Sequence, residues 1–226
     1  MVQKSAKLPE TAPPQRGRPR AYDPEEALNR ATGAFWNAGY SATSLDALSE
    51  ATGMNRPSLY GAFGDKRELY LATLERYTGQ GRMAMQAALK PGYTLRESLT
   101  RVYDAALAFY YPEGETARGC FLVGTAATES VTDPEVRARL GDGLRDFDRE
   151  FELRFQRAKE EGALPAGANP ASLAKVASAI LHTLALRSRA GDTRAGLRAT
   201  AQAGIDLICG AAVPQSKRGV PKVRAR

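Results

Sequence analysis

The chain has 226 residues and a net charge of +7, a length that favours a small domain joined to a larger one and a charge that favours a polyanionic partner. The positive charge is concentrated at the ends, because residues 1–22 carry +4 and residues 214–226 carry +5, which leaves −2 for residues 23–213. Two distant cysteines, a polar N-terminus and no long apolar run argue against a disulfide scaffold, a zinc finger and a membrane protein, so a cytoplasmic protein without metal or cofactor is expected.

Residues 1–21 contain four prolines among polar residues and show no apolar periodicity, so a disordered basic arm is expected. The segment Gln15-Arg-Gly-Arg-Pro-Arg20 within it resembles an AT-hook, in which arginines enter the minor groove of A·T-rich DNA. Arg18 and Arg20 are therefore candidate DNA contacts. The alternative is a solvated basic tail without a specific partner.

A first helix is expected directly after the arm. Asp23 can cap its N-terminus, Pro24 suits its first position because the missing N–H needs no partner there, and Gly39 can end it. Phe35 and Trp36 are expected in the core that this helix forms with its neighbours.

Two very short helices joined by a tight turn are expected between Thr43 and Gly64. Thr43 is expected to cap the first, in a capping box with Asp46, and Gly53 to end it; Asn55 is expected to cap the second. Helices this short are marginal alone in water, so both must pack against the preceding helix. This arrangement is a helix–turn–helix, whose second helix can enter a major groove of DNA.

The candidate DNA contacts are the polar and small residues at the helix N-termini and along the second helix. Hydroxyls and free N–H groups at a helix N-terminus suit a phosphate oxygen, and an arginine can pair with a guanine edge, which makes Arg56 the best candidate for a base contact. The expected set in this region is Thr43, Ser44, Asn55, Arg56, Pro57, Ser58, Tyr60 and Gly61.

The segments Gly39-Tyr-Ser-Ala-Thr-Ser44 and Leu59-Tyr-Gly-Ala-Phe-Gly-Asp-Lys66 resemble the DNA-binding domain of the TetR family of bacterial transcriptional regulators, over roughly residues 22–72. The resemblance implies an all-α homodimer that represses transcription from a palindromic double-stranded DNA operator and is released by a small molecule in its C-terminal domain. It also implies that Lys66 anchors a phosphate. Gly61 and Ala62 depart from the family pattern, where many members have an aromatic residue and a histidine, so those contacts are not carried over.

A helix that begins after Asp65 is expected to join the helix–turn–helix domain, residues 22–68, to a C-terminal helical bundle, residues 69–213, that binds the effector and dimerises. Residues 170–210 mix small and large apolar residues, which allows a close intersubunit four-helix bundle, and residues 214–226 are expected to form a disordered basic tail. Helices are expected over residues 94–111, 119–127, 133–161, 170–190 and 193–210.

The effector pocket is expected where aromatic residues of the C-terminal domain meet, since small-molecule sites are mostly apolar. Cys120 is expected near a helix N-terminus and beside Arg118, both of which favour a thiolate, so it is a candidate sensor of oxidants or electrophiles. Ordinary core packing is the alternative for every member, Cys120 and His182 included. The candidates are Tyr103, Phe109, Tyr110, Cys120, Phe121, Phe147, Phe151, Phe155 and His182.

An enzyme is not expected, because one histidine, no glycine-rich phosphate loop and no metal-ligand spacing leave catalysis without its usual groups. The function favoured by the sequence is a DNA-binding regulator, with a repressor preferred over an activator by the family resemblance alone. The alternative is a helical adaptor that does not bind DNA.

Overall fold

The computed structural model describes residues 22–112 and 117–210, and within these ranges the chain is helical and contains no strand. The expected all-α fold is confirmed. The helices are α1 (Pro24–Ala38), α2 (Leu45–Thr52), α3 (Arg56–Phe63), α4 (Lys66–Ala88), α5 (Leu95–Tyr110), η1 (Leu122–Ala126), α6 (Ala127–Glu129), α7 (Pro134–Glu160), α8 (Pro170–Arg189) and α9 (Arg194–Cys209). The arginines expected in the basic arm, Arg18 and Arg20, and the basic tail lie outside the described residues.

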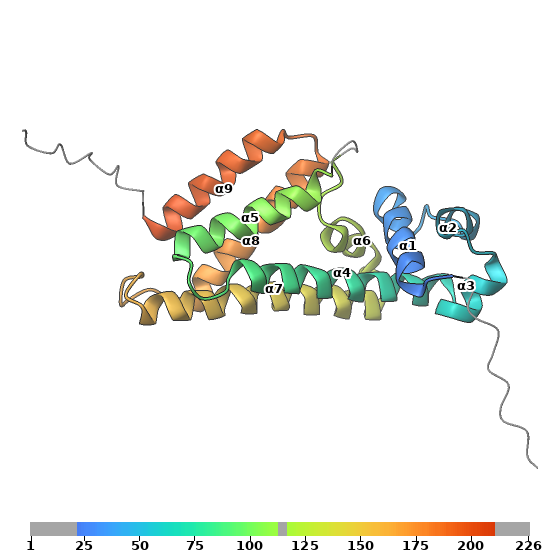
Figure 1. Cartoon of the computed structure of the whole chain (residues 1–226), viewed down its shortest axis with the longest axis horizontal. Helices are drawn as coiled ribbons and strands as arrows, with labels where there is room; N and C mark the ends of the chain where they lie inside the picture. Colours follow the sequence, from blue (N-terminus) through green and yellow to red (C-terminus); the bar gives the residue numbers. More distant parts are fainter. Residues whose placement is uncertain (1–21, 113–116, 211–226) are drawn as a thin grey trace, which may run out of the picture.

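Two long helices, α4 and α7, lie side by side along the length of the molecule (Figure 1). Helices α1 to α3 sit at one end of α4. Toward the other end α5 packs against α4, while α8 packs against α7 and α9 packs against α5 and α8. Helix α4 therefore continues from the helix–turn–helix into the bundle and crosses the boundary expected between residues 68 and 69. None of the helices in the described ranges is both long and apolar enough to cross a bilayer.

The helix boundaries follow the capping residues in the sequence. Asp23, Asn55 and Asp65 each accept a hydrogen bond from a backbone N–H in the first turn of their helix, as expected. The N-terminal cap of α2 was expected one residue too early in the chain. Ser44 caps α2 by accepting from the Ala47 N–H at 3.1 Å, so the assignment of the cap to Thr43 is wrong.

One aromatic core joins the helix–turn–helix to the bundle. The ring of Trp36 in α1 lies 5.1 Å from that of Tyr77 in α4 and 5.6 Å from that of Phe121, measured between centroids. Tyr70 in α4 contacts both Phe35 and Phe121 with edge-to-face geometry, which adds to the area they bury. The two parts of the chain therefore share packed side chains.

The buried segment expected over residues 119–127 contains a π-helix, η1, followed by the single turn α6. Gly143 of α7 allows η1 to approach closely, because a Cβ there would lie 2.7 Å from Leu122 Cδ2 and 3.0 Å from Thr78 Cγ2. The junction of α4, α7 and η1 thus has no room for a larger residue at Gly143.

Candidate functional sites

Helix α3 has a buried side and an exposed side. Leu59 is buried and packs into the core, whereas Tyr60 is 47% exposed. Pro57 and Ser58 in its first turn and Gly61 in the middle are exposed as well. The short helix therefore keeps a surface free for a partner, as a recognition helix requires.

Arg56 stands at the start of α3, with its side chain about half exposed. Its Nε and Nη2 donate to one carboxylate oxygen of Asp46 in α2, at 3.0 and 2.6 Å, and this hydrogen bond raises the pKa of the guanidinium. The pair holds the side chain between the two short helices. A guanine that accepts from Arg56 must compete with Asp46 for the same donors.

The other expected DNA contacts differ in their exposure and in whether their polar atoms already have partners within the protein. Ser44 and Asn55 are exposed but their side-chain oxygens accept from backbone N–H groups, at 3.1 and 2.9 Å. The Nζ of Lys66 lies 4.4 Å from the centre of the Tyr40 ring, and partial burial lowers its pKa. Thr43 is only 2% exposed and its hydroxyl donates to the Gly39 carbonyl, so this side chain cannot reach DNA in this structure.

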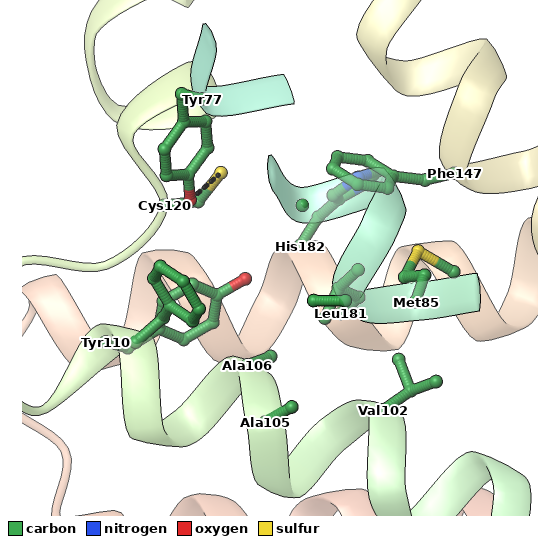
Figure 2. Close-up of a pocket in the computed structure, with 13 residues that line it drawn as sticks. Tyr77, Met85, Val102, Ala105, Ala106, Tyr110, Cys120, Phe147, Leu181 and His182 are labelled. Atoms are coloured by element: carbon green, nitrogen blue, oxygen red, sulfur yellow. Dashed lines mark hydrogen bonds between the residues drawn. The ribbon is translucent and has the colours of Figure 1, made fainter. Parts of the chain in front are cut away.

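A cavity of about 60 Å³ lies among α4, α5, α7 and α8, with Cys120 at one end (Figure 2). It brings together five of the nine expected pocket residues: Phe109, Tyr110, Cys120, Phe147 and His182. The sequence did not indicate the rest of the wall, since small residues such as Ala105 and Ala106 look like ordinary helix-packing positions. The lining residues missed are Tyr77, Gly81, Ala84, Met85, Val102, Ala105, Ala106 and Leu181.

The remaining four expected pocket residues do not line the cavity. Tyr103, Phe121, Phe151 and Phe155 are fully buried in the core. Phe151 packs against both Tyr103 and Phe155, and the Tyr103 hydroxyl donates to the Ala177 carbonyl of α8 at 3.1 Å. The phenylalanines of α7 lie on one face of the helix, but only Phe147 lines the cavity.

Cys120 does not have the electrostatic surroundings expected of a sensor thiol. Its position before η1 lets backbone N–H groups of Leu122 and Val123 stabilise negative charge, but burial outweighs them and raises the pKa of the thiol. The Tyr77 hydroxyl donates to Sγ at 3.3 Å. Arg118 lies over the Trp36 ring, 4.2 Å from its centre. The expectation of a favoured thiolate is therefore wrong, because desolvation dominates.

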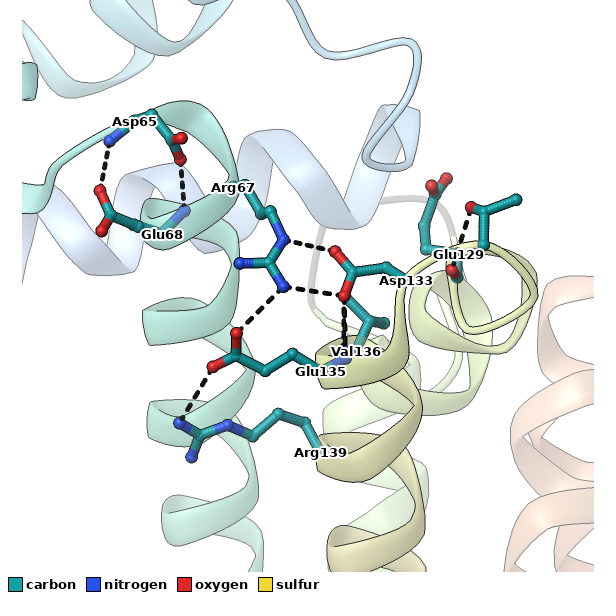
Figure 3. A network of polar contacts seen from close by, with 9 residues as sticks. Asp65, Arg67, Glu68, Glu129, Asp133, Glu135, Val136 and Arg139 are labelled. Atoms are coloured by element: carbon teal, nitrogen blue, oxygen red, sulfur yellow. Dashed lines mark hydrogen bonds and ion pairs between the residues drawn. The ribbon is translucent and has the colours of Figure 1, made fainter.

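Polar contacts also join the helix–turn–helix to the bundle. Arg67, in the first turn of α4, donates to both carboxylate oxygens of Asp133 and to Glu135 at the start of α7 (Figure 3). Ser41, before α2, donates to Glu129 of α6 at 2.9 Å. The residues that flank the helix–turn–helix are therefore attached to α6 and to the start of α7.

A helix–turn–helix with an exposed second helix, joined through α4 to a helical bundle, defines a class of DNA-binding transcriptional regulator. Residues 27–73 match the family described as "Bacterial regulatory proteins, tetR family", and residues 96–203 match "Tetracyclin repressor-like, C-terminal domain". The chain is 31% identical to the HTH-type transcriptional repressor ComR of Escherichia coli (strain K12), over 78% of this chain and 84% of that protein. The chain belongs to the TetR family of DNA-binding transcriptional regulators.

Solved structures agree with this assignment. A cysteine mutant of the TetR family regulator CifR, complexed with 26-base-pair double-strand operator DNA, is 31% identical, with a TM-score of 0.72 over 83% of this chain and 98% of that one. Reduced NemR of E. coli has a TM-score of 0.74 at 20% identity, over 84% of this chain and 98% of that one. The second likeness shows the fold alone.

Proposed function

We propose that this protein is a repressor that binds a palindromic operator as a homodimer and leaves it when a small molecule enters the C-terminal cavity. The observation that carries the proposal is the two-sided α3, which buries Leu59 and leaves Arg56, Ser58 and Tyr60 at the surface. These side chains have the donors and the aromatic face that DNA recognition uses. The protein would then act on the bacterial chromosome, in the cytoplasm.

Helices α8 and α9 support the dimer. Val176 and Leu186 on α8 are 50% and 56% exposed, and Leu207 on α9 is 86% exposed. Large apolar side chains at the surface of neighbouring helices favour association with a like surface. Within the pair, a Cβ on Gly204 of α9 would lie 2.5 Å from Ile180 Cδ1, so the two helices already approach closely. We assign the dimer interface to this hairpin, within residues 170–210.

A residue of the cavity wall also packs against the helix–turn–helix, which allows ligand binding to affect DNA binding. Tyr77 and Cys120 line the cavity, and Tyr77 packs against Trp36 of α1. A ligand that moves Tyr77 therefore moves a side chain in the core under the helix–turn–helix. Because both recognition helices of a dimer must reach their grooves together, a small change in their separation lowers the affinity of the whole dimer.

A gel shift on the DNA upstream of the gene itself tests the proposal. A retarded complex that weakens steeply as the salt concentration rises from roughly 50 to 200 mM is expected, since lysine and arginine contacts release counterions from phosphate. The alternative, a helical adaptor, predicts no complex at any salt concentration. If no complex forms at any salt concentration, the proposal that the protein is a DNA-binding regulator is rejected.

A further inference from the structure

The wall of the cavity is uncharged. Among the residues that the structure describes, no aspartate, glutamate, lysine or arginine lines it, and most of the wall is aliphatic or aromatic carbon from residues such as Met85, Val102, Phe147 and Leu181 (Figure 2). A charged ligand placed there would lose its hydration without meeting an opposite charge. This costs several kcal/mol for an unpaired ion.

The few polar groups in the wall are also neutral near pH 7. Burial raises the pKa of Tyr77, Tyr110 and Cys120 and lowers that of His182, although the Asp148 carboxylate acts in the opposite direction on the imidazole. The Nε2 of His182 is buried and has no hydrogen-bond partner among the described residues. The cavity therefore offers dipoles to a ligand and no net charge.

The size of the cavity limits the ligand. Its volume of about 60 Å³ is below the roughly 150 Å³ of a cavity that accepts benzene, so the ligand can be no larger than about a single aromatic ring. Figure 2 shows the hydroxyl of Tyr110 directed toward the space between the lining residues, while the Tyr77 hydroxyl is engaged with Cys120. Tyr110 is thus a polar group placed to meet a ligand.

We propose that the effector of this cavity is an uncharged, mainly apolar molecule about as large as a single aromatic ring, with one polar group that hydrogen-bonds to the Tyr110 hydroxyl. The proposal rests on the cavity being the effector site of the proposed function. It names the chemical class of the effector, and it assigns no covalent step to Cys120.

Benzyl alcohol, toluene, benzoate and benzylammonium test the class, because they share a ring and differ in polarity and charge. Binding to the full chain is measured by calorimetry and by the rise in melting temperature that any ligand of the folded state produces. Benzyl alcohol and toluene are expected to bind, and the two ions to bind roughly a hundredfold more weakly or not at all. Equal binding of either ion, or no binding of the neutral compounds, overturns the proposal.

One matched pair of variants and the single variant Tyr110→Phe locate the binding. Ala106→Leu fills the cavity and should abolish binding, whereas Ala108→Leu adds the same side chain at an exposed position of the same helix and should not. Tyr110→Phe should weaken benzyl alcohol roughly two- to tenfold, the worth of one hydrogen bond, and leave toluene unchanged. Binding that survives Ala106→Leu, or a Tyr110→Phe effect equal for both compounds, contradicts the assignment.

Operator binding is measured separately for each protein by fluorescence anisotropy, without probes. Wild type and Ala108→Leu are expected to bind DNA equally, because Ala108 lies outside both the cavity and the helix–turn–helix. If none binds DNA but the neutral probes still bind wild type and not Ala106→Leu, the repressor function fails while the ligand class stands. If all bind DNA and the probes fail, only the ligand class is wrong.

Discussion

At the scale of single residues, Arg56 is the side chain on which recognition of a particular sequence depends most. It is exposed and stands at the start of α3, where it can exchange Asp46 for a base edge. We expect Arg56→Ala to weaken operator binding roughly tenfold to a hundredfold, the loss typical of a bidentate base contact. Fluorescence anisotropy on the operator and on scrambled DNA measures it.

The control is Arg145→Ala, which removes an arginine that is equally paired, with Asp142, but exposed on α7 far along the chain from the helix–turn–helix. Its operator affinity should match wild type. If the two variants lose affinity equally, the effect of Arg56 is one of overall charge, and the base contact is disproved.

Cys120 leads to a prediction about reactivity and pH. Burial raises the pKa of the thiol above its ordinary value of 9.0, so at pH 7 iodoacetamide should leave Cys120 unmodified in the native protein and label it quickly in urea. As pH rises above that value, the unfolded state loses a proton that the folded state keeps, and the free energy of unfolding should fall. Mass spectrometry of peptides labelled at several pH values checks the first point. Native labelling at the rate of a free thiol would contradict it.

At the scale of helices, α7 approaches η1 and α4 closely at Gly143. A methyl group there must displace Leu122 and Thr78, so Gly143→Ala should destabilise the fold by about 1–3 kcal/mol, the usual cost of overpacking. Urea denaturation measures the change.

Gly141→Ala on the same helix is the matched control. Its new methyl group would meet only the guanidinium of Arg145 at 3.1 Å, which is flexible and exposed. Alanine in a helix interior gains about 0.5–1 kcal/mol over glycine, so this variant should be as stable as wild type or more. Two variants of equal stability would show that the close approach at η1 does not matter.

Helix ends were predictable because their signals are local. Asp23 and Asn55 precede a proline in the first turn, and a cap next to such a proline is hard to misplace. The start of α2 has neighbouring hydroxyls at Thr43 and Ser44, and only the packing of Thr43 against α1 decides between them. The recognition helix α3 could thus be located from the sequence, and the one error concerned the N-terminal cap of the neighbouring helix α2.

The cavity was only partly predictable because its wall is set by tertiary packing. The periodicity of α7 shows that Phe147, Phe151 and Phe155 share a face, but not which of them ends beside a void. The π-helix at η1 also escapes a sequence pattern, because a wider turn needs no special residue. The surroundings of Cys120 likewise depend on residues distant in sequence, such as Tyr77, whose hydroxyl donates to its Sγ.

At the scale of the whole molecule, the dimer is what makes two short recognition helices sufficient. Leu207→Glu places a charge on the exposed face of α9, and we expect the protein to become monomeric and to lose most of its operator affinity. Analytical ultracentrifugation gives the mass. Leu153→Glu, at an exposed position of α7, is the control and should remain dimeric. A dimeric Leu207→Glu protein would move the interface away from α9.

Protection of guanine N7 from dimethyl sulfate on the operator tests the central claim most directly, because N7 lies in the major groove. The account predicts two protected patches whose centres are about 10 base pairs apart, one for each α3 of a dimer, and restored reactivity at one guanine per patch with Arg56→Ala. A complex that forms without any protected N7, or with patches that do not repeat about a two-fold axis, would contradict it.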